Sequence, residues 1–274
     1  MNSPITLCGS LSLHPVLTGS LMHLAAYRAL NLNFTYVPFH MTSQKLPQAL
    51  QAMRTLQIRG FGVSMPFKIE VIPLLDELDP LAQKIGAVNT IVNNDGHLIG
   101  HNSDWIGALR ALQEVLGPDG LRDQHCLLIG AGGAARAIAF GLSTTGAHVT
   151  IANRSPERAR QLASVTDAVD ASDLSILHSL DRFSVIINAT SAGMAASPSQ
   201  TIVPASQLHP ALTVMDAVYD PVETRLIIDA KKAGARTVDG GRMLLHQAAR
   251  QFELYTGLPA PLDAMDGALR QASQ

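Results

Sequence analysis

The sequence predicts an α/β protein of two domains, and three observations support this prediction. The chain has 274 residues, 47% of them hydrophobic and 15% charged, so it can bury a core in each of two domains of ordinary size. Short β-rich runs alternate with segments of helix length, which is typical of βαβ units and a mostly parallel sheet. The alternation starts again near Cys126, after a stretch punctuated by glycine, proline and charge.

The expected elements follow in order along the chain. The first half alternates the strands ITLCGSL (5–11), FTYVPF (34–39) and GFGVSM (60–65) with the helix-length segments LMHLAAYRALN (21–31), LPQALQAMRTL (46–56) and IEVIPLLDEL (69–78). The second half contains the strands CLLI (126–129), HVTIANR (148–154), SVIINAT (184–190), LTVMDAVY (212–219) and ARTVDG (235–240). We therefore place a first α/β domain at about 1–104 and a second α/β domain at about 105–239. The remaining segment, 240–274, has a helical pattern that Gly257 and Pro259 end, and the pattern leaves open on which domain it packs.

Composition excludes several classes of function. The formal charge is −2, which gives no basic surface for a nucleic acid. The N-terminal residues lack a signal-peptide pattern, and no apolar run is long enough for a membrane span, so we expect a cytoplasmic protein. Cys8 and Cys126 have no CxxC partner, and His14, His23 and His40 lack the spacing of metal ligands. We expect no metal site and no disulfide.

The glycine-rich turn after residue 129 is typical of a dinucleotide site. It follows an apolar strand and precedes the helical run AARAIAFGL (134–142), so its backbone can approach a pyrophosphate at a helix N-terminus. The alternative is a tight βα turn that binds no ligand. The turn residues expected to bind the cofactor are Gly130, Ala131, Gly132, Gly133 and Ala134, with Ala135 in place of the third fingerprint glycine.

The end of the next expected strand favours NADP over NAD. About 20 residues beyond the glycines, an NAD site needs an acid that accepts hydrogen bonds from the ribose hydroxyls. Asn153 and Arg154 occupy that place, and the first acid is Glu157. Arg154 would attract a 2′-phosphate, which an acid would repel. Arg158 lies four residues further and either assists Arg154 or is a solvated helix charge.

Six motifs along the chain resemble the shikimate dehydrogenase family. They are SMPFK (64–68), GAVNTIV (86–92), HNSDWIG (101–107), NATSAGM (188–194), DAVYDPVET (216–224) and MLLHQAA (243–249). The resemblance covers nearly the whole chain in the family's order. It implies an N-terminal substrate domain, an NADP-binding Rossmann domain and a C-terminal helix, 240–274, that returns to the first domain.

The resemblance also implies an acid/base pair. Lys68 matches the family's lysine and Asp104 its aspartate, on either side of the reacting carbon. Reduction of a ketone creates an alkoxide that must receive a proton, and an ammonium can supply it. Alternatively, the two residues form an ordinary surface ion pair. Further matches are implied for the substrate at Ser64, Asn89, Tyr219 and Gln247, and for the cofactor cleft at Asn188, Thr190 and Met194.

The chain departs from the family's pattern at three places. The usual serine pair before the histidine matched by His23 is absent, because the stretch reads Leu17-Thr18-Gly19-Ser20. Gly62 replaces the asparagine of the N-V-T-V-P-F-K motif. Arg242 stands where the family has glycine, and either clamps a substrate carboxylate or crowds the cofactor. Each lost hydrogen bond to a carboxylate costs about 1.5–3 kcal/mol.

With these departures, the chain most resembles the divergent branch of the family called shikimate dehydrogenase-like. The resemblance implies an NADP-dependent oxidoreductase that transfers hydride reversibly between the cofactor and shikimate or a related cyclic hydroxy-acid, with weak shikimate activity as one outcome. Two alternatives remain open: a quinate-type dehydrogenase, and a non-catalytic NADP- or metabolite-binding regulator. The expected partner is a small-molecule substrate, with no nucleic acid and no membrane, and the sequence leaves open a monomer or a homodimer.

Overall fold

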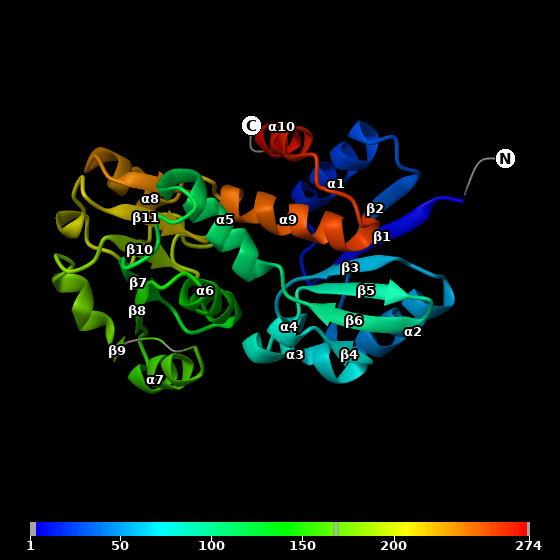
Figure 1. Ribbon diagram of the computed structural model, residues 1–274, viewed down its shortest axis with the longest axis horizontal. Helices are drawn as coiled ribbons and strands as arrows, with labels where there is room; N and C mark the ends of the chain where they lie inside the picture. Colours follow the sequence, from blue (N-terminus) through cyan, green and yellow to red (C-terminus); the bar gives the residue numbers. More distant parts are fainter. Residues whose placement is uncertain (1–3, 167, 169, 273–274) are drawn as a thin grey trace. The chain divides into compact units, whose positions relative to one another are not determined.

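The computed structural model describes residues 4–166, 168 and 170–272, and its contacts divide the chain into two compact units (Figure 1). Unit 1 consists of the described residues up to Ser103 together with those from Gln247 onward, and unit 2 is Asp104–His246. Helix α9 (Gly240–Thr256) contributes residues to both units. No helix within these described residues has the length and hydropathy needed to cross a bilayer.

Unit 1 is built on a six-stranded sheet. Its strands are β1 (Thr6–Ser12), β2 (Phe34–His40), β3 (Gly60–Val63), β4 (Glu77–Leu78), β5 (Thr90–Asn94) and β6 (His97–His101), in the order β2-β1-β3-β5-β6-β4. β1 runs parallel to both β2 and β3, whereas β5 is antiparallel to β3 and β6. The helices are α1 (Thr18–Ala29), α2 (Leu46–Thr55), α3 (Phe67–Glu70), α4 (Pro80–Ile85) and α10 (Leu262–Ala272), with 3₁₀ turns at Ser43–Lys45 and Ile72–Leu74.

Apolar spacing explains how α2 packs in this unit. Leu46, Leu50 and Met53 recur at helical spacing and are buried in one cluster with Phe61 of β3 and Ile91 of β5. A second contact joins α1 to α10, so the last described helix packs on the first one. The described residues from Gln247 onward therefore complete unit 1, whereas residues 240–246 of the predicted C-terminal segment belong to unit 2.

Two local features of unit 1 differ from the sequence-based expectation. The stretch 69–78 is no single helix: it contains the end of α3, a 3₁₀ turn and β4, because Pro73 has no N–H to continue a helix. The hairpin of β5 and β6 was not predicted. Its signal is the pair Asp95-Gly96, whose φ angles of 51° and 92° form the two-residue turn that such a hairpin requires.

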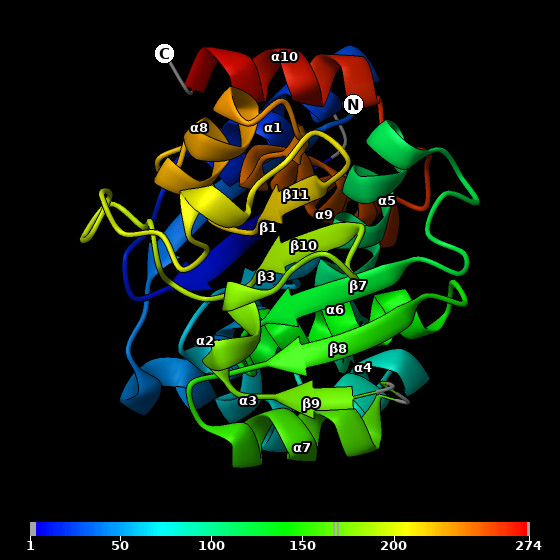
Figure 2. The same cartoon turned by 90° about the vertical axis from the view of Figure 1, so that its left-hand side faces the viewer.

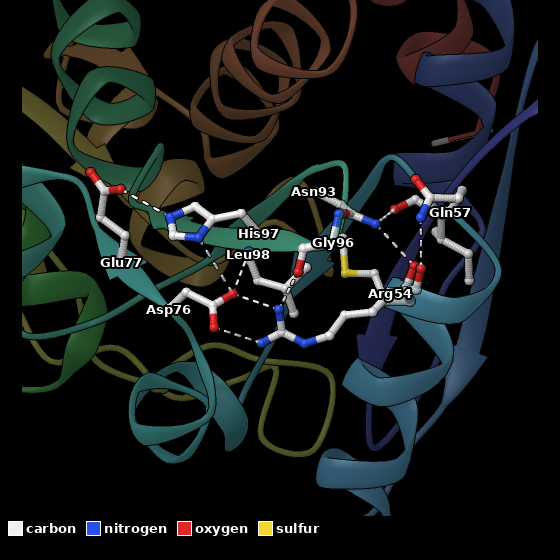
Figure 3. Close-up of polar contacts among 10 residues, drawn as sticks. Arg54, Gln57, Asp76, Glu77, Asn93, Gly96, His97 and Leu98 are labelled. Atoms are coloured by element: carbon white, nitrogen blue, oxygen red, sulfur yellow. Dashed lines mark hydrogen bonds and ion pairs between the residues drawn. The ribbon is translucent and has the colours of Figure 1, made fainter.

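A cluster of polar groups joins the end of α2 to this hairpin (Figure 3). Arg54 donates to the Asp76 carboxylate, with Nη2 3.1 Å from Oδ1, and to the carbonyl of Gly96. Asp76 also accepts a hydrogen bond of 2.7 Å from the N–H of Leu98. The hydrogen bond from Arg54 lowers the pKa of Asp76. These bonds tie α2, the segment before β4 and the start of β6 together.

Unit 2 has a parallel sheet with helices on both faces. Its strands are β7 (His125–Ile129), β8 (His148–Ala152), β9 (Asp170–Ser172), β10 (Val185–Asn188), β11 (Thr213–Asp216) and β12 (Arg236–Val238), in the order β12-β11-β10-β7-β8-β9. Figure 2 shows β11, β10, β7, β8 and β9 side by side in this order. The helices are α5 (Asp104–Leu116), α6 (Gly133–Ser143), α7 (Pro156–Val165) and α8 (Arg225–Lys232), with 3₁₀ turns at Leu174–His178 and Ala205–Gln207.

Alternate residues of β7, β8, β10 and β11 point to two separate cores. Cys126 and Leu128 pack with residues of α5, α6 and α7, whereas Leu127 and Ile129 pack with α8 and the 3₁₀ turns. The strand order reverses between β7 and β10, and in such sheets ligands bind beyond the carboxyl ends of the strands at this point. The predicted doubly wound α/β architecture is confirmed.

Candidate active site

The glycine turn lies at the carboxyl end of β7, at the switch point of the unit 2 sheet. Gly130 has a φ of 121°, and a Cβ there would lie 3.0 Å from the carbonyl oxygen of Ala189, so no other residue fits without strain. At Gly132 and Gly133 a Cβ would meet no heavy atom within 4 Å. The turn therefore leaves open space before the N-terminus of α6, where backbone N–H groups can bind a pyrophosphate. Ala131 and Ala134 are half-buried in the same turn.

A pocket of about 330 Å³ adjoins this region of unit 2. It brings together three predicted cofactor residues, Asn153 and Arg154 after β8 and Thr190 after β10. The Arg154 guanidinium supplies positive charge, and no described Asp or Glu side chain lines the pocket, which fits a phosphorylated ribose. Among the described residues, its lining is Ile129, Asn153, Arg154, Leu174, Thr190, Ser191, Ala192, Gln200 and Ile202. Arg158 and Met194 are exposed and lie outside this lining.

A buried network supports the loop after β10. The Asn188 side chain accepts hydrogen bonds from the N–H and hydroxyl of Thr190, at 3.0 and 2.7 Å, and donates to Asp216 at 3.0 Å. Asp216 also accepts a bond of 2.7 Å from Thr224, which caps α8. Burial raises the pKa of Asp216, although its hydrogen bonds oppose this. We had not predicted roles for Asp216 and Thr224; both lie in the DAVYDPVET motif, which was the available signal.

In unit 1, Asn89 is the centre of a second buried polar cluster, and it is completely inaccessible to solvent. Its Oδ1 accepts hydrogen bonds from the Ser103 N–H at 2.7 Å and from the Thr90 hydroxyl at 2.8 Å. Its Nδ2 donates to the Ser103 hydroxyl at 3.0 Å. The Asn89 amide thereby joins the start of β5 to the turn after β6.

The predicted acid/base residues are attached to this same segment. Lys68 lies in α3, half-buried, and its carbonyl accepts a hydrogen bond of 2.8 Å from the N–H of Val88. Asp104 is 2% exposed, begins α5 and directly follows Ser103. Lys68 and Ser103 are thus held by consecutive residues, Val88 and Asn89, although 35 positions separate them in the sequence.

The other predicted substrate residues differ in accessibility. Ser64 is exposed at the end of β3, where its N–H donates to the carbonyl of Leu11 at 3.0 Å. Gln247 is half-buried on α9 and belongs to unit 1. Tyr219 is 37% exposed in the segment after β11 of unit 2. All three residues are at least partly accessible to solvent, and no hydrogen bond joins their side chains to the Asn89 cluster among the described residues.

Arg242 has a structural contact that the sequence did not reveal. Its guanidinium donates two hydrogen bonds to the Glu114 carboxylate on α5, at 2.7 and 2.6 Å. His246 contacts the same carboxylate at 2.8 Å. Burial opposes ionisation of Glu114, but the hydrogen bonds from Arg242 and His246 lower its pKa overall. Arg242 therefore joins α9 to α5 within unit 2.

Comparison with family models gives three matches in chain order. The shikimate dehydrogenase substrate binding domain matches residues 15–91, the shikimate / quinate 5-dehydrogenase model matches 111–223, and the shikimate 5′-dehydrogenase C-terminal domain matches 240–270. These matches cover five of the six motifs in part or in full, and HNSDWIG lies between the first match and the second.

Individual proteins similar to this chain are also named shikimate or quinate dehydrogenases. A protein of Natronomonas pharaonis named shikimate dehydrogenase (NADP(+)) is 45% identical over 258 residues, which cover 92% of this chain and 93% of that protein. The structure of a shikimate 5-dehydrogenase from Thermus thermophilus with NADP(H) and shikimate has a TM-score of 0.89 and 34% identity, covering 98% of this chain and 100% of that one. A quinate dehydrogenase from Corynebacterium glutamicum with NAD also has a TM-score of 0.89, at 32% identity, covering 97% and 99%.

Proposed function

Because the chain belongs to the shikimate dehydrogenase family, we propose that Lys68 and Asp104 catalyse reversible hydride transfer between NADP(H) and shikimate or 3-dehydroshikimate. The chain is an NADP-dependent oxidoreductase. Substrate binding is assigned to residues 1–104 and 240–274, and cofactor binding to residues 105–239.

The chemistry of the pair follows from the charge that develops on the substrate. When a ketone is reduced, its oxygen becomes an alkoxide, and the Lys68 ammonium can donate a proton to that oxygen. In the opposite direction, the neutral amine of Lys68 accepts the hydroxyl proton. Asp104 accepts a hydrogen bond from a substrate hydroxyl and orients the ammonium. Ser64, Asn89, Tyr219 and Gln247 are assigned to the remaining polar groups of the substrate.

Unit 2 supplies the residues that would hold the cofactor. When bound, NADP supplies or accepts the hydride. The open face at Gly132 and Gly133 suits its pyrophosphate, and Arg154 suits the 2′-phosphate. Arg158 is close to Arg154 in sequence and would add positive charge, while Thr190 and Met194 lie in the loop assigned to the rest of the cofactor.

One observation carries the assignment of the pair. Lys68 and the residue before Asp104 are both hydrogen-bonded to the Val88-Asn89 segment, so a single buried segment fixes the backbone at both positions. A surface ion pair would need no such support, because exposed pairs contribute little stability. The 2% exposure of Asp104 also differs from a solvated surface charge.

The test is an assay of the purified chain with NADP⁺ or NAD⁺ and either shikimate or quinate, followed by NADPH or NADH absorbance. We expect turnover with shikimate and a higher kcat/KM for NADP⁺ than for NAD⁺. Preference for quinate would identify the quinate-type alternative. Binding of NADPH or shikimate by calorimetry without any turnover would identify a regulator and contradict the proposal.

The proposal also covers the oligomeric state of the chain and its location in the cell. We expect the chain to act on small molecules as a monomer or a homodimer, which sedimentation of the purified protein would distinguish. We also propose a cytoplasmic location, since Cys8 and Cys126 are both buried free thiols, as is usual in a reducing compartment.

A further inference from the structure

Gln251 is a buried polar residue of α9 that lies two positions beyond the MLLHQAA motif, outside the six motifs. It is 6% exposed and lies in unit 1. Its Nε2 is 3.2 Å from the carbonyl oxygen of Asn89 and 3.2 Å from the Thr90 hydroxyl, and its Oε1 is 3.5 Å from Nε2 of His23. A buried amide is costly unless its polar atoms are bonded, and here both ends of the amide have partners.

These partners determine the direction of every bond. A carbonyl can only accept, so the nitrogen end of the Gln251 amide must face Asn89. Its Oε1 then accepts from His23, which must carry its proton on Nε2. Burial lowers the pKa of His23 to about 4, although the bond to Gln251 opposes this, so the imidazole is neutral at pH 7.

The direction of the hydrogen bonds can be followed from Gln251 through Thr90 to Asn89. Thr90 receives a hydrogen bond from Gln251, so its own hydroxyl proton is directed to Oδ1 of Asn89, 2.8 Å away. The Ser103 N–H donates to that same oxygen at 2.7 Å. The Ser103 N–H can only donate, so it determines which end of the Asn89 amide is oxygen, and the Thr90 hydroxyl gives that oxygen a second donor. They also fix the backbone at Ser103, immediately before Asp104.

Gly62 provides independent support for this arrangement. A Cβ at this position would lie 2.9 Å from the Tyr36 hydroxyl and 3.3 Å from Nε2 of Gln251. The Tyr36 ring is buried and stacked on His23, with centroids 4.3 Å apart, so it cannot easily move. Gln251 thus occupies space that exists because residue 62 has no side chain.

We propose that Gln251 is a positioning residue of the active site: through Thr90 and the Asn89 carbonyl it holds in place the Asn89 amide and the Ser103 turn that precedes Asp104. The proposal rests on the proposed function, because Asn89 and Asp104 have their roles there. Gln251 itself touches no substrate, since its amide is committed to Asn89, Thr90 and His23. A polar group at the reacting carbon that is misplaced by about 1 Å can cost up to 100-fold in rate.

The test compares Thr90→Val, Thr90→Ser and Gln251→Met with the parent, by steady-state kinetics on shikimate and by NADPH titration. Valine keeps the volume of threonine but loses the hydroxyl, whereas serine keeps the hydroxyl and loses a methyl. We expect Thr90→Val and Gln251→Met to lower kcat/KM for shikimate about ten-fold or more. The Kd for NADPH should stay within about two-fold of the parent. Thr90→Ser should recover most of the activity.

Tyr255→Phe is the matched control. Tyr255 lies one turn further along α9, is buried, and has a hydroxyl with no hydrogen-bond partner among the described residues. Its variant also removes one buried polar atom from the same helix, and we expect parent kinetics. Melting temperatures of all variants show whether each is folded at the assay temperature; if Gln251→Met is unfolded, the Thr90 pair decides.

Three results would overturn the proposal. Parent kinetics in Thr90→Val would show that the Thr90 hydroxyl does not link Gln251 to Asn89. Equal losses in Thr90→Ser and Thr90→Val would show that the volume of the side chain matters rather than its hydroxyl. A parallel loss of NADPH affinity would indicate general damage to the fold. If the parent chain turns over neither shikimate nor quinate, the proposed function is wrong, and the role proposed for Gln251 is wrong as well. The assay of the parent chain shows this before any variant is made.

Discussion

The glycine turn of unit 2 and the Asn89 cluster of unit 1 are both polar sites, but they are assembled in different ways. The turn is made of backbone within five consecutive residues, 130–134, and its Cβ positions at Gly132 and Gly133 are open. The Asn89 cluster is made of buried side chains from His23 to Gln251, which are 228 positions apart. The first site can be recognised in a short motif, whereas the second requires the folded chain.

The difference also predicts how each site responds to mutation. A site made of backbone N–H groups and one exposed arginine should lose ligand affinity without losing stability. A site made of buried hydrogen bonds should lose orientation, and the catalytic rate with it, when a single member is removed. The predictions below test this contrast, beginning with the largest expected effect.

Lys68→Ala should lower kcat by about 10²–10⁴, because the alkoxide then lacks its proton donor. The Kd for NADPH should remain that of the parent, which would separate proton transfer at Lys68 from cofactor binding in unit 2. Lys84→Ala, at an exposed lysine in the last turn of α4, is the control and should retain parent turnover. If Lys68→Ala turned over at the rate of the parent, Lys68 would not be the proton donor.

Arg154→Ala should raise the KM for NADPH about 10- to 100-fold, since a charge-assisted hydrogen bond contributes about 1.5–3 kcal/mol. The KM for NADH, which has no 2′-phosphate, should change little, and the melting temperature should not fall. Arg160→Ala removes an exposed arginine of α7 that pairs with Glu157, and it should leave both values unchanged. Equal effects on NADPH and NADH would contradict 2′-phosphate recognition.

Arg242→Ala should lower the melting temperature by about 2–6 °C, because the paired hydrogen bonds to Glu114 are lost. Its KM for shikimate should stay within about two-fold of the parent. This result would distinguish a structural contact from the carboxylate clamp that the sequence left open. Arg270→Ala, at a 74% exposed side chain, is expected to shift the melting temperature by less than about 1 °C.

Asp76→Asn should have the smallest effect, about 1–3 °C in melting temperature at pH 7, because the Arg54 pair is partly solvated. The pKa of Asp76 is lower in the folded chain than its usual 3.8, so its stabilisation is present above that value. It is lost as the pH falls through the folded pKa. The difference between parent and variant should therefore shrink in acid. Asp181→Asn, at an exposed aspartate, is the control that should show no such trend.

The sequence predicted the nucleotide half of the fold in detail. The five strands of unit 2 that it named are confirmed, and Asn153, Arg154 and Thr190 lie around one pocket as the strand ends suggested. Unit 1 was predicted less completely. The β5–β6 hairpin was not predicted, although the pair Asp95-Gly96 is typical of such a turn. One helix was predicted over residues 69–78, where Pro73 interrupts it. The roles of the individual site residues stay predictions, as does the assignment to the divergent branch.

The order of residues alone determined the α/β class, the dinucleotide turn and the choice of a phosphorylated cofactor. Each of these depends on neighbours in the chain: periodic apolar residues, glycines without Cβ atoms, and an arginine at a strand end. Tertiary structure alone decided that Arg242 bonds to Glu114 and that Gln251 orients Asn89. A buried hydrogen bond depends on which side chains the fold brings within about 3 Å, and residues that are distant in sequence carry no mark of that proximity.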